Sequence, residues 1–219
     1  MTAPPSLRTT VKRQPDRGRY DAAQVHAVLD EGLVAHVGLA TDEGPVVIPM
    51  LYARDGDRLL LHGSPASRLL RGGKATELCV TVTLVDGLVL ARSAFHHSMN
   101  YRSVVVIGHA TPVADLDERR AALDTLVEHI VPGRTADTRE PNDKELRGTL
   151  VLALPLDEAS VKVRTGPPLD EDEDYDLDHW AGVVPVSTVF GAPEPDPALP
   201  PGIAVPAYAA GYRRPRPGR

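Results

Sequence analysis

The stretch "LVAHVGLATDEGPVVIPMLYARDGDRLLLHG" (residues 33–63) contains three short apolar runs separated by two polar segments. The runs cover residues 33–41, 45–53 and 58–63, each the length of an ordinary strand. Asp42-Glu43-Gly44 and Asp55-Gly56-Asp57 separate them, and these residue types favour tight turns between antiparallel strands. The stretch therefore predicts a meander of three antiparallel strands.

Outside this stretch, further apolar runs have the same texture: "ELCVTVTLV", "LVLARSAF", "VVVIG", "TLVLALPL" and "ASVKVRTG". The first two are separated by Asp86-Gly87, a predicted turn. Helices are predicted at residues 21–32 with Asp21 as N-cap, at residues 63–74 with Ser64 as N-cap, and at residues 115–134. Since the strands follow one another without alternating helices, we expect a mainly β fold, an antiparallel barrel of about seven strands with three attached helices.

The composition changes towards both ends of the chain. Residues 1–20 are polar, basic and proline-containing and predict an extended N-terminal arm. From residue 191 to residue 219 the chain is proline-rich and predicts a tail without its own core. Residues 21–190 are thus expected to form the folded domain. The acidic run "LDEDEDYDLD" (residues 169–178) within it predicts a solvated loop, because its spacing differs from that of a calcium-binding loop.

Length and charge limit the classes of function. The 219 residues suffice for one sizeable domain, and the net charge of −6 argues against a general nucleic-acid binder. No stretch has the roughly 18–20 apolar residues of a membrane span, and the N-terminus lacks the apolar core of a signal peptide. We therefore expect no membrane segment and a cytoplasmic location. The single cysteine, Cys79, lies in an apolar run and is predicted to be a buried, unreactive thiol.

Several common catalytic motifs are missing from the sequence. It has no glycine-rich dinucleotide loop after a strand, no P-loop and no Gly-x-Ser-x-Gly elbow. The eight histidines do not show the i, i+4 spacing that places two imidazoles on one face of a helix. We therefore expect no metal site.

The segment "HGSPASR" (residues 62–68) predicts an anion site. If Ser64 caps a helix that begins at Pro65, free backbone N–H groups and the positive end of the helix dipole point outward. The hydroxyls of Ser64 and Ser67 and the guanidinium of Arg68 lie beside them in sequence. This set of donors is suited to a phosphate group.

A second polar cluster precedes a predicted strand in "HHSMNYRSVVVIGHA" (residues 96–110). Arg102 and Ser103 stand at the start of the apolar run, where they can supply the other half of a phosphate site on a neighbouring strand. The alternative is that Arg102 pairs with a carboxylate and that Ser103 only begins the strand. Residue spacing leaves both interpretations open.

Five motifs occur in an order that identifies a family resemblance: "RQPDRGRYD", "VIPMLYARDGDRLLLHG", "DGLVLARSAFHHSMNYRSVVVIGHA", "KVRTG" and "WAGVVPV". Residues from about 7 to 190 resemble the pyridoxamine 5'-phosphate oxidase-related family of FMN-binding split barrels, in particular its flavin-nucleotide-binding branch with the nitroimidazole-resistance (Nim) proteins. The resemblance implies an antiparallel FMN-binding split β-barrel, and a homodimer with FMN at the interface.

The family's cofactor contacts can be transferred to matching positions of this sequence. The resemblance implies that the strand around Pro49 runs along the flavin, that Ser67 and Arg68 take the phosphate, and that Trp180 approaches the ring from the partner chain. The full set of expected cofactor-binding residues is Ile48, Pro49, Met50, His62, Gly63, Ser64, Ser67, Arg68, Tyr101, Arg102, Ser103 and Trp180. For His62 the resemblance also suggests a catalytic role, in which the imidazole donates a proton or positions a substrate; the alternative is that it only packs against the ring.

The function implied by the resemblance is an FMN-dependent oxidoreductase, nitroreductase-like, that reduces a small organic acceptor with NADH or NADPH as the electron donor. One alternative is a flavin-binding carrier or sensor without turnover. Another is a pyridoxine or pyridoxamine 5'-phosphate oxidase, although the C-terminal segment ending "YAAGYRRPRPGR" does not match the substrate-binding end of those enzymes. Relatives that use a deazaflavin or bind haem belong to the same family, so the identity of the cofactor also stays open.

Overall fold

The computed structural model describes residues 2–64 and 76–214. The predicted meander is confirmed, with β2 (Val34–Thr41), β3 (Gly44–Asp55) and β4 (Arg58–Gly63) pairing antiparallel in sequence order. Gly44 and Gly56 have φ angles of 116° and 57° in the two turns. These angles lie in the left-handed region that glycine adopts most easily, which explains the glycine in each turn.

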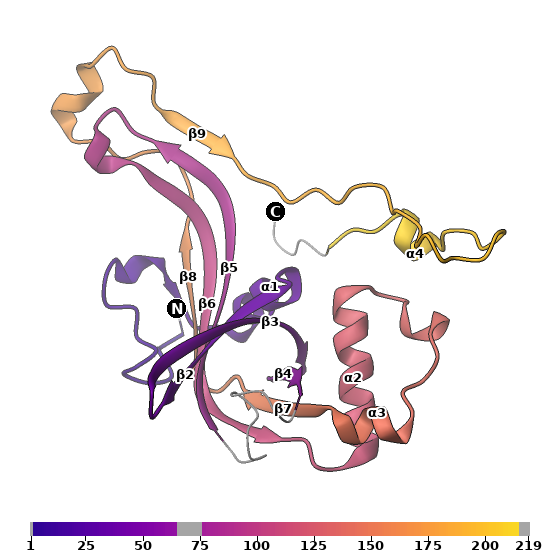
Figure 1. Cartoon of the computed structure of the whole chain (residues 1–219). Helices are drawn as coiled ribbons and strands as arrows, with labels where there is room; N and C mark the ends of the chain where they lie inside the picture. Colours follow the sequence, from indigo (N-terminus) through magenta and orange to yellow (C-terminus); the bar gives the residue numbers. More distant parts are fainter. Residues whose placement is uncertain (1, 65–75, 215–219) are drawn as a thin grey trace.

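The strands close into a barrel (Figure 1). Besides the meander, the ring contains β5 (Thr76–Leu90), β6 (Ser98–Pro112) and β7 (Leu150–Pro155). Its order is β6-β7-β4-β3-β2-β5, and β5 pairs with β6 again. β6 also pairs with β8 (Ala159–Arg164), which carries the short edge strand β1 (Gly18–Arg19), while β9 (Gly182–Pro185) extends the edge of β5. The expected mainly β, antiparallel split barrel is confirmed.

Alternation along the strands divides the core into two parts. Leu59 and Leu61 of β4 face the barrel interior, where they join the larger apolar cluster with Val37, Val80 and Val104. Leu60 faces the other way and packs with Ala122 and Leu126 of helix α2 (Leu116–Ile130). β4 is therefore apolar on both faces because each face is covered.

The predicted turn at Asp86-Gly87 is wrong. β5 continues through these residues, and the register with β6 shifts between Val85 and Gly87 as at a β-bulge. A Cβ atom on Gly87 would lie 2.8 Å from Cγ1 of Val183, so glycine here permits the close approach of β9. β5 and β6 thus extend beyond the barrel as a long two-stranded ribbon, called the β5–β6 arm below (Figure 1).

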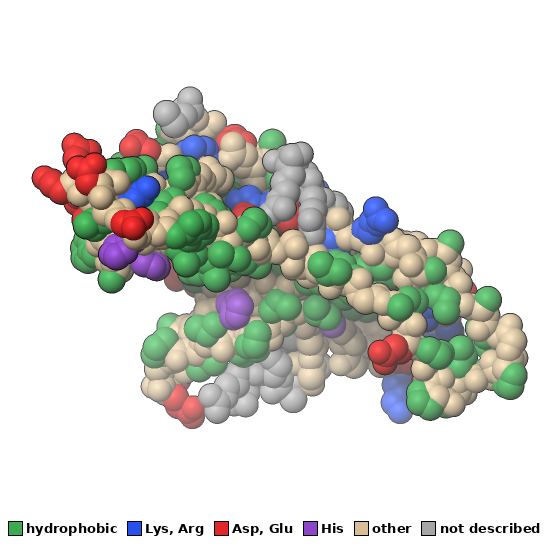
Figure 2. All heavy atoms as spheres, turned by 90° about the horizontal axis from the view of Figure 1, so that it is seen from above, with side chains coloured by type: hydrophobic (Ala, Val, Ile, Leu, Met, Phe, Trp, Pro, Cys, Tyr) green, Lys and Arg blue, Asp and Glu red, His purple; other side chains and the backbone are tan. Residues whose placement is uncertain are grey.

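The polar cluster of residues 96–103 also differs from expectation. β6 begins at Ser98, after the short 3₁₀ helix η2 (Ala94–His96), so Arg102 and Ser103 lie within the strand and not at its start. The tip of the β5–β6 arm carries the 3₁₀ helix η4 (Asp172–Asp176). Acidic side chains gather at this tip (Figure 2), where the predicted acidic loop lies.

The helices lie around the barrel. α1 (Ala22–Glu31) begins as predicted, with the Asp21 carboxylate accepting a hydrogen bond from the backbone N–H of Gln24. α2 is followed by η3 (Thr135–Asp137) and α3 (Asp143–Gly148). The helix predicted to follow Ser64 lies outside the described residues. No helix in the described ranges has the length and apolar character needed to cross a bilayer.

Within the described residues, the N-terminal and C-terminal segments both contact the barrel domain. In the N-terminal arm, the 3₁₀ helix η1 (Pro15–Arg17) precedes β1, which pairs with β8. The C-terminal segment contains α4 (Ala207–Ala210) and returns towards the ends of α1 and α2 (Figure 1). The Tyr212 hydroxyl donates a hydrogen bond to the Ile130 carbonyl at the end of α2. This part of the proline-rich segment is held to the domain by specific contacts.

Candidate functional site

β3 presents alternate residues to opposite sides of the barrel wall. Ile48 and Met50 pack against the barrel core, whereas Pro49 is exposed between Val47 and Leu51. Consecutive side chains on a strand point to opposite faces, so the three predicted residues do not offer their side chains to one ligand. On the outer face, Pro49 can contact a ligand with its side chain. The side chains of Ile48 and Met50 point inward and pack against the barrel core.

The outer face of β2, β3 and β5 has an exposed apolar surface. Val34, Val47, Leu51 and Val85 are all more than a third exposed, and Val47 reaches 63%. Cys79 lies on this face and is exposed, so the prediction of a buried thiol is wrong. The residues around Cys79 are apolar, which suggested a fully buried run. In the structure only alternate residues of β5 face the core, and Cys79 is on the other face.

His62 lies at the end of β4, followed by Gly63. Its Nδ1 atom is buried and has no hydrogen-bond partner within residues 2–64 and 76–214. Burial lowers the pKa of His62, so its imidazole is neutral near pH 7. A buried ring nitrogen without a partner costs free energy, which makes it a natural contact for a ligand atom.

Ser64 is exposed directly after β4. Ser67 and Arg68, the two expected phosphate contacts, lie outside the described residues. Their role therefore stays a prediction.

Arg102 makes ion pairs with two carboxylates from different elements. Its Nε and Nη2 donate to Asp86 at 2.9 and 2.8 Å, and its Nη1 and Nη2 donate to Glu31 at 2.6 and 3.0 Å. Hydrogen bonds with Asp86 and then Glu31 raise the pKa of Arg102. Four of its five N–H groups are engaged in this way. The geometry favours the structural interpretation, in which the ion pairs of Arg102 join the end of α1 to the β5–β6 arm, over a phosphate contact.

Tyr101 and Ser103 lie on the face of β6 opposite to Arg102. Ser103 stands beside Thr83 of β5 and Lys162 of β8. β4 pairs with β3 and β7, and β6 pairs with β5, β7 and β8, so the two strands are not hydrogen-bonded neighbours. The expectation that the anion-binding segment after β4 (residues 62–68) and the pair Arg102-Ser103 lie on neighbouring strands is therefore wrong.

Trp180 lies just before β9 and is 70% exposed. Its indole covers Gly182, where an added Cβ atom would lie 2.8 Å from the ring. An exposed indole of this size is a suitable contact for a second molecule.

The structure also contains a cavity of about 690 Å³ that the sequence did not predict. It lies between the C-terminal segment and the body of the protein. Its lining includes Glu31, Leu84, Asp86, Phe190 and Tyr212. The one sequence signal for it is the aromatic and basic group at residues 212–214, which interrupts the proline-rich segment.

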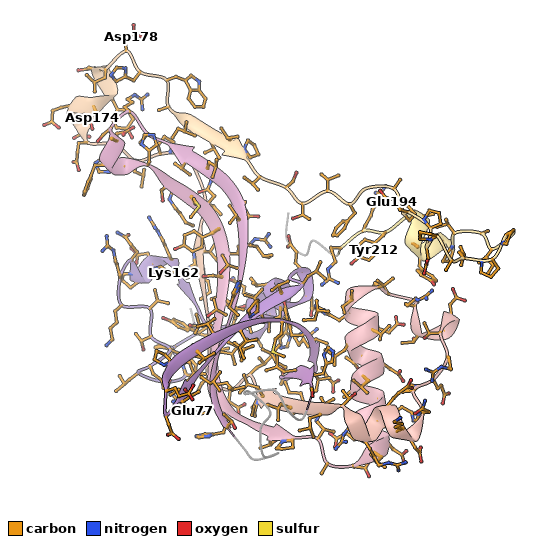
Figure 3. All side chains as sticks on the ribbon, viewed as in Figure 1. Glu77, Lys162, Asp174, Asp178, Glu194 and Tyr212 are labelled. Atoms are coloured by element: carbon orange, nitrogen blue, oxygen red, sulfur yellow. The ribbon has the colours of Figure 1, made fainter. Side chains whose placement is uncertain are left out.

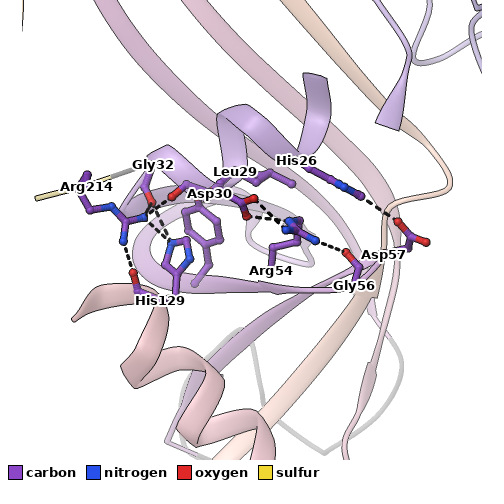
Figure 4. Close-up of polar contacts among 10 residues, drawn as sticks. His26, Leu29, Asp30, Gly32, Arg54, Gly56, Asp57, His129 and Arg214 are labelled. Carbon is purple, nitrogen blue, oxygen red and sulfur yellow. Dashed lines mark hydrogen bonds and ion pairs between the residues drawn. The ribbon is translucent and has the colours of Figure 1, made fainter. Parts of the chain in front are cut away.

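Arg214 is one of the residues that line this cavity, and it joins the C-terminal segment to the ends of α1 and α2 (Figure 4). Its guanidinium donates to the main-chain oxygens of Asp30, Glu31 and Gly32 at the end of α1, and to that of His129 near the end of α2. Cations are stabilised at helix C-termini, where carbonyl groups lack helical partners. One side chain therefore caps two helices. Next to it, Asp30 forms a bidentate ion pair with Arg54.

Comparison with known proteins extends these observations. Residues 21–163 match the family model described as pyridoxamine 5'-phosphate oxidase. Flavocytochrome Anf3 from Azotobacter vinelandii is 41% identical, with a TM-score of 0.93 over 97% of this chain and 100% of that one. The FAD and haem binding protein from Mycobacterium smegmatis is 38% identical, with a TM-score of 0.86 over 90% of this chain and 98% of that one.

A 5-nitroimidazole antibiotic resistance protein from Bacteroides thetaiotaomicron is 26% identical, with a TM-score of 0.55 over 67% of this chain and 86% of that one. No curated protein sequence matches. The family model covers well over half of the 219 residues, and it agrees with the closed antiparallel barrel. This chain belongs to the pyridoxamine 5'-phosphate oxidase-related family of split-barrel proteins.

Proposed function

We propose that this protein binds a flavin nucleotide and transfers electrons through it as a flavin-dependent oxidoreductase. The observation that carries the proposal is the similarity to a flavocytochrome over nearly the whole of both chains. A bound flavin supplies hydride and single-electron chemistry, while the protein binds it, orients it and sets its electrostatic surroundings. The acceptor is proposed to be a small organic molecule, with NADH or NADPH as donor.

The residues around His62 fit such a cofactor. The buried Nδ1 of His62 lacks a partner in the described part of the chain, and a ligand atom at this position would satisfy it. We assign His62 the role of contacting the flavin or its substrate through this nitrogen. Ser67 and Arg68 would hold the phosphate, and Pro49 and Gly63 would border the ring.

The flavin expected from the sequence is FMN. The similarity to a protein that binds FAD favours FAD, which has the same ring with a second phosphate and an adenosine. The two are distinguished by releasing the bound cofactor with heat and identifying it chromatographically before and after phosphodiesterase treatment. FAD is converted to FMN by this treatment, whereas FMN is unchanged.

We further propose a homodimer in which the cofactor site is shared. His62 and Ser103 lie on strands that are not adjacent in one chain, and in the proposed dimer the second copy supplies Ser103 to the ligand that contacts His62. The exposed apolar surface with Val47 and Leu51 and the exposed Trp180 supply the contact area. In this arrangement Trp180 of one protomer approaches the site of the other.

A second candidate function is electron transfer between a flavin and a haem, without a small organic acceptor. It is favoured by the two solved structures with the greatest similarity reported above, a flavocytochrome and an FAD and haem binding protein. Imidazole is a common axial ligand of haem iron, and the chain has eight histidines.

The deciding experiment is an absorption spectrum of the full chain purified without added cofactor, followed by a pyridine haemochrome assay. Flavin bands alone with steady NADH or NADPH oxidation in the presence of a nitro compound or quinone support the oxidoreductase. Flavin and haem bands together support the second candidate. Bound flavin without turnover supports a carrier or sensor, and oxygen-dependent formation of pyridoxal phosphate supports a pyridoxamine 5'-phosphate oxidase. Absence of any chromophore after FMN and FAD addition contradicts the proposal.

A further inference from the structure

A groove of about 250 Å³ lies between the N-terminal residues 8–13 and the outer face of β6 and β8. Ser103 and Val105 of β6 and Ser160 and Lys162 of β8 form its floor. Ser103 stands opposite Lys162, and Val105 stands opposite Ser160, so the four side chains share one face of the sheet. Figure 3 marks Lys162 beside the N-terminal segment.

The groove wall is held in place by contacts to the barrel. The backbone N–H of Val11 donates to the Tyr20 hydroxyl at 2.9 Å, and Arg8 forms ion pairs with Glu77 and Glu158. β1 pairs with β8 directly beside the floor, with Gly18 opposite Lys162. The groove is therefore a formed feature of the fold.

Three cations at the groove have no carboxylate partner in the described structure: Lys12, Arg13 and Lys162. This contrasts with most arginines elsewhere. Arg54, Arg58, Arg92, Arg102 and Arg139 all form ion pairs with carboxylates. In a chain with an excess of acidic residues, a group of unpaired cations at one groove indicates a site for an external anion.

The hydroxyls on the floor point to the same conclusion. Ser160 is only 6% exposed, lines the groove and has no side-chain hydrogen bond to any described residue. Ser103, which lies diagonally across the two strands from Ser160, likewise has no side-chain partner in that part of the chain. An anion in the groove would accept hydrogen bonds from both hydroxyls.

Arg164 adds a further positive charge next to the floor of the groove. Arg164 follows Lys162 on the same face of β8 and is 6% exposed. It donates to Asn100 and to the main-chain oxygens of Gly166 and Pro167, all of which are neutral. Burial and then the neighbouring Arg17 lower the pKa of Arg164, as expected among other cations. The positive charge of this region is not cancelled locally.

We propose that this groove is an anion site that binds a phosphate group of a nucleotide ligand. The identity of the nucleotide rests on the proposed function: the phosphate belongs either to the adenylate half of FAD or to NADH or NADPH. Both sources present the same chemistry, a phosphate oxygen that accepts from lysine, arginine and serine donors.

The test compares the full chain with its Lys162→Met and Ser160→Ala variants. Lys144→Met is the matched control, because Lys144 is an exposed lysine on α3 without a side-chain partner in the described structure. Dissociation constants are measured for inorganic pyrophosphate, FMN, FAD, NADH and NADPH. For the ligand whose phosphate occupies the groove, Lys162→Met should weaken binding at least about tenfold, and Ser160→Ala should weaken it less. Lys144→Met should change it by less than about twofold.

Loss of affinity for FAD but not FMN would identify the adenylate half of the flavin. Loss confined to NADH and NADPH would identify the electron donor. Unchanged affinity for all five probes in Lys162→Met would overturn the proposal. A chain that binds no flavin but binds pyrophosphate in a Lys162-dependent way would retain the groove and contradict the flavin function. Should Lys162→Met fail to fold, Lys12→Met on the exposed arm removes a groove cation without touching the sheet and should act in the same direction.

Discussion

The Arg214 guanidinium lies against the His129 imidazole, with 3.2 Å between Nη2 and Nε2. His129 Nε2 also lies 2.9 Å from the Gly32 carbonyl oxygen, which can only accept a hydrogen bond. The ring therefore carries its proton on Nε2 in that bond, and Arg214 donates to the carbonyls around it. A second proton on the ring would place two cations in contact where the C-terminal segment joins the domain.

This contact predicts a loss of stability in mild acid. Burial and, after it, the charge of Arg214 lower the pKa of His129. In the unfolded chain histidine titrates near pH 6.5, so the unfolded state takes up the proton first. The free energy of unfolding should be constant above about pH 6.5 and fall as the pH drops below it.

Thermal unfolding between pH 8 and pH 5 checks this prediction. His62, whose pKa is also lowered by burial, adds to the same slope, so the relevant quantity is the difference between the wild type and His129→Gln at each pH. That difference should shrink towards pH 5. His26→Gln, which removes the partner of the exposed Asp57, is the control. A difference independent of pH would show that His129 is not the titrating group.

Replacing Arg102 should destabilise the fold. Arg102→Met leaves Glu31 and Asp86 close together without their shared cation, and we expect a loss of about 2–3 kcal/mol in the free energy of unfolding. Urea unfolding measures this loss. At a temperature where the variant is folded, its flavin affinity should stay within a few-fold of the wild type. A large loss of affinity without loss of stability would restore Arg102 as a cofactor contact.

His62 is expected to affect the reaction more than the fold. Under the proposed function, His62→Ala should lower the rate of flavin-dependent turnover by about 10²-fold if the imidazole transfers a proton. His62→Asn keeps a hydrogen-bonding group and should retain flavin affinity, which separates binding from proton transfer. Stopped-flow reduction of the bound flavin is the measurement. Exposed His109 provides the control variant His109→Gln, and equal rates in all three variants would favour the interpretation that His62 only packs against the ring.

Val47→Asp tests the proposed dimer. Val47 is 63% exposed in one chain, so the substitution costs the monomer little, but it would bury a charge in a dimer formed through the outer face of β3. Sedimentation velocity should show monomers, with flavin lost from the shared site. Ile203→Asp changes an equally apolar exposed residue on the C-terminal segment and should leave the assembly unchanged. If the Val47→Asp variant still forms dimers with full flavin content, the dimer interface does not include the outer face of β3.

The sequence predicted the elements whose signals are local. Acidic residues and glycine mark the turns around β3, and Asp21 marks the start of α1, because turns and caps depend on the residues that form them. The same reasoning failed at Asp86-Gly87. There, the residues that favour a turn form a β-bulge instead, and β9 packs on this bulge. β9 lies almost 100 residues further along the chain.

The site divides in the same way. Ser103 could be identified as a candidate from its polar neighbours, and His62 from its place at a strand end. The face of the sheet on which each side chain lies and the residues that it contacts could not be predicted from neighbouring residues. Strand alternation sends Ile48 and Met50 inward, and the separation of β4 from β6 depends on the order in which the ring closes. The carboxylates that engage Arg102 come from α1 and from β5, and no spacing rule connects them.

The sequence by itself determined a mainly antiparallel β domain, since hydrophobic alternation and turn chemistry act over a few residues, and its ordered motifs marked the resemblance to this family. Only the tertiary structure decided that Arg102 pairs with two carboxylates, that Arg214 caps two helices, and that Ser160 and Lys162 line a groove with Lys12 and Arg13 of the N-terminal segment. These relationships join residues up to 184 positions apart, as between Arg214 and Asp30. The free energy of such contacts depends on distance in space, which the order of residues along the chain does not specify.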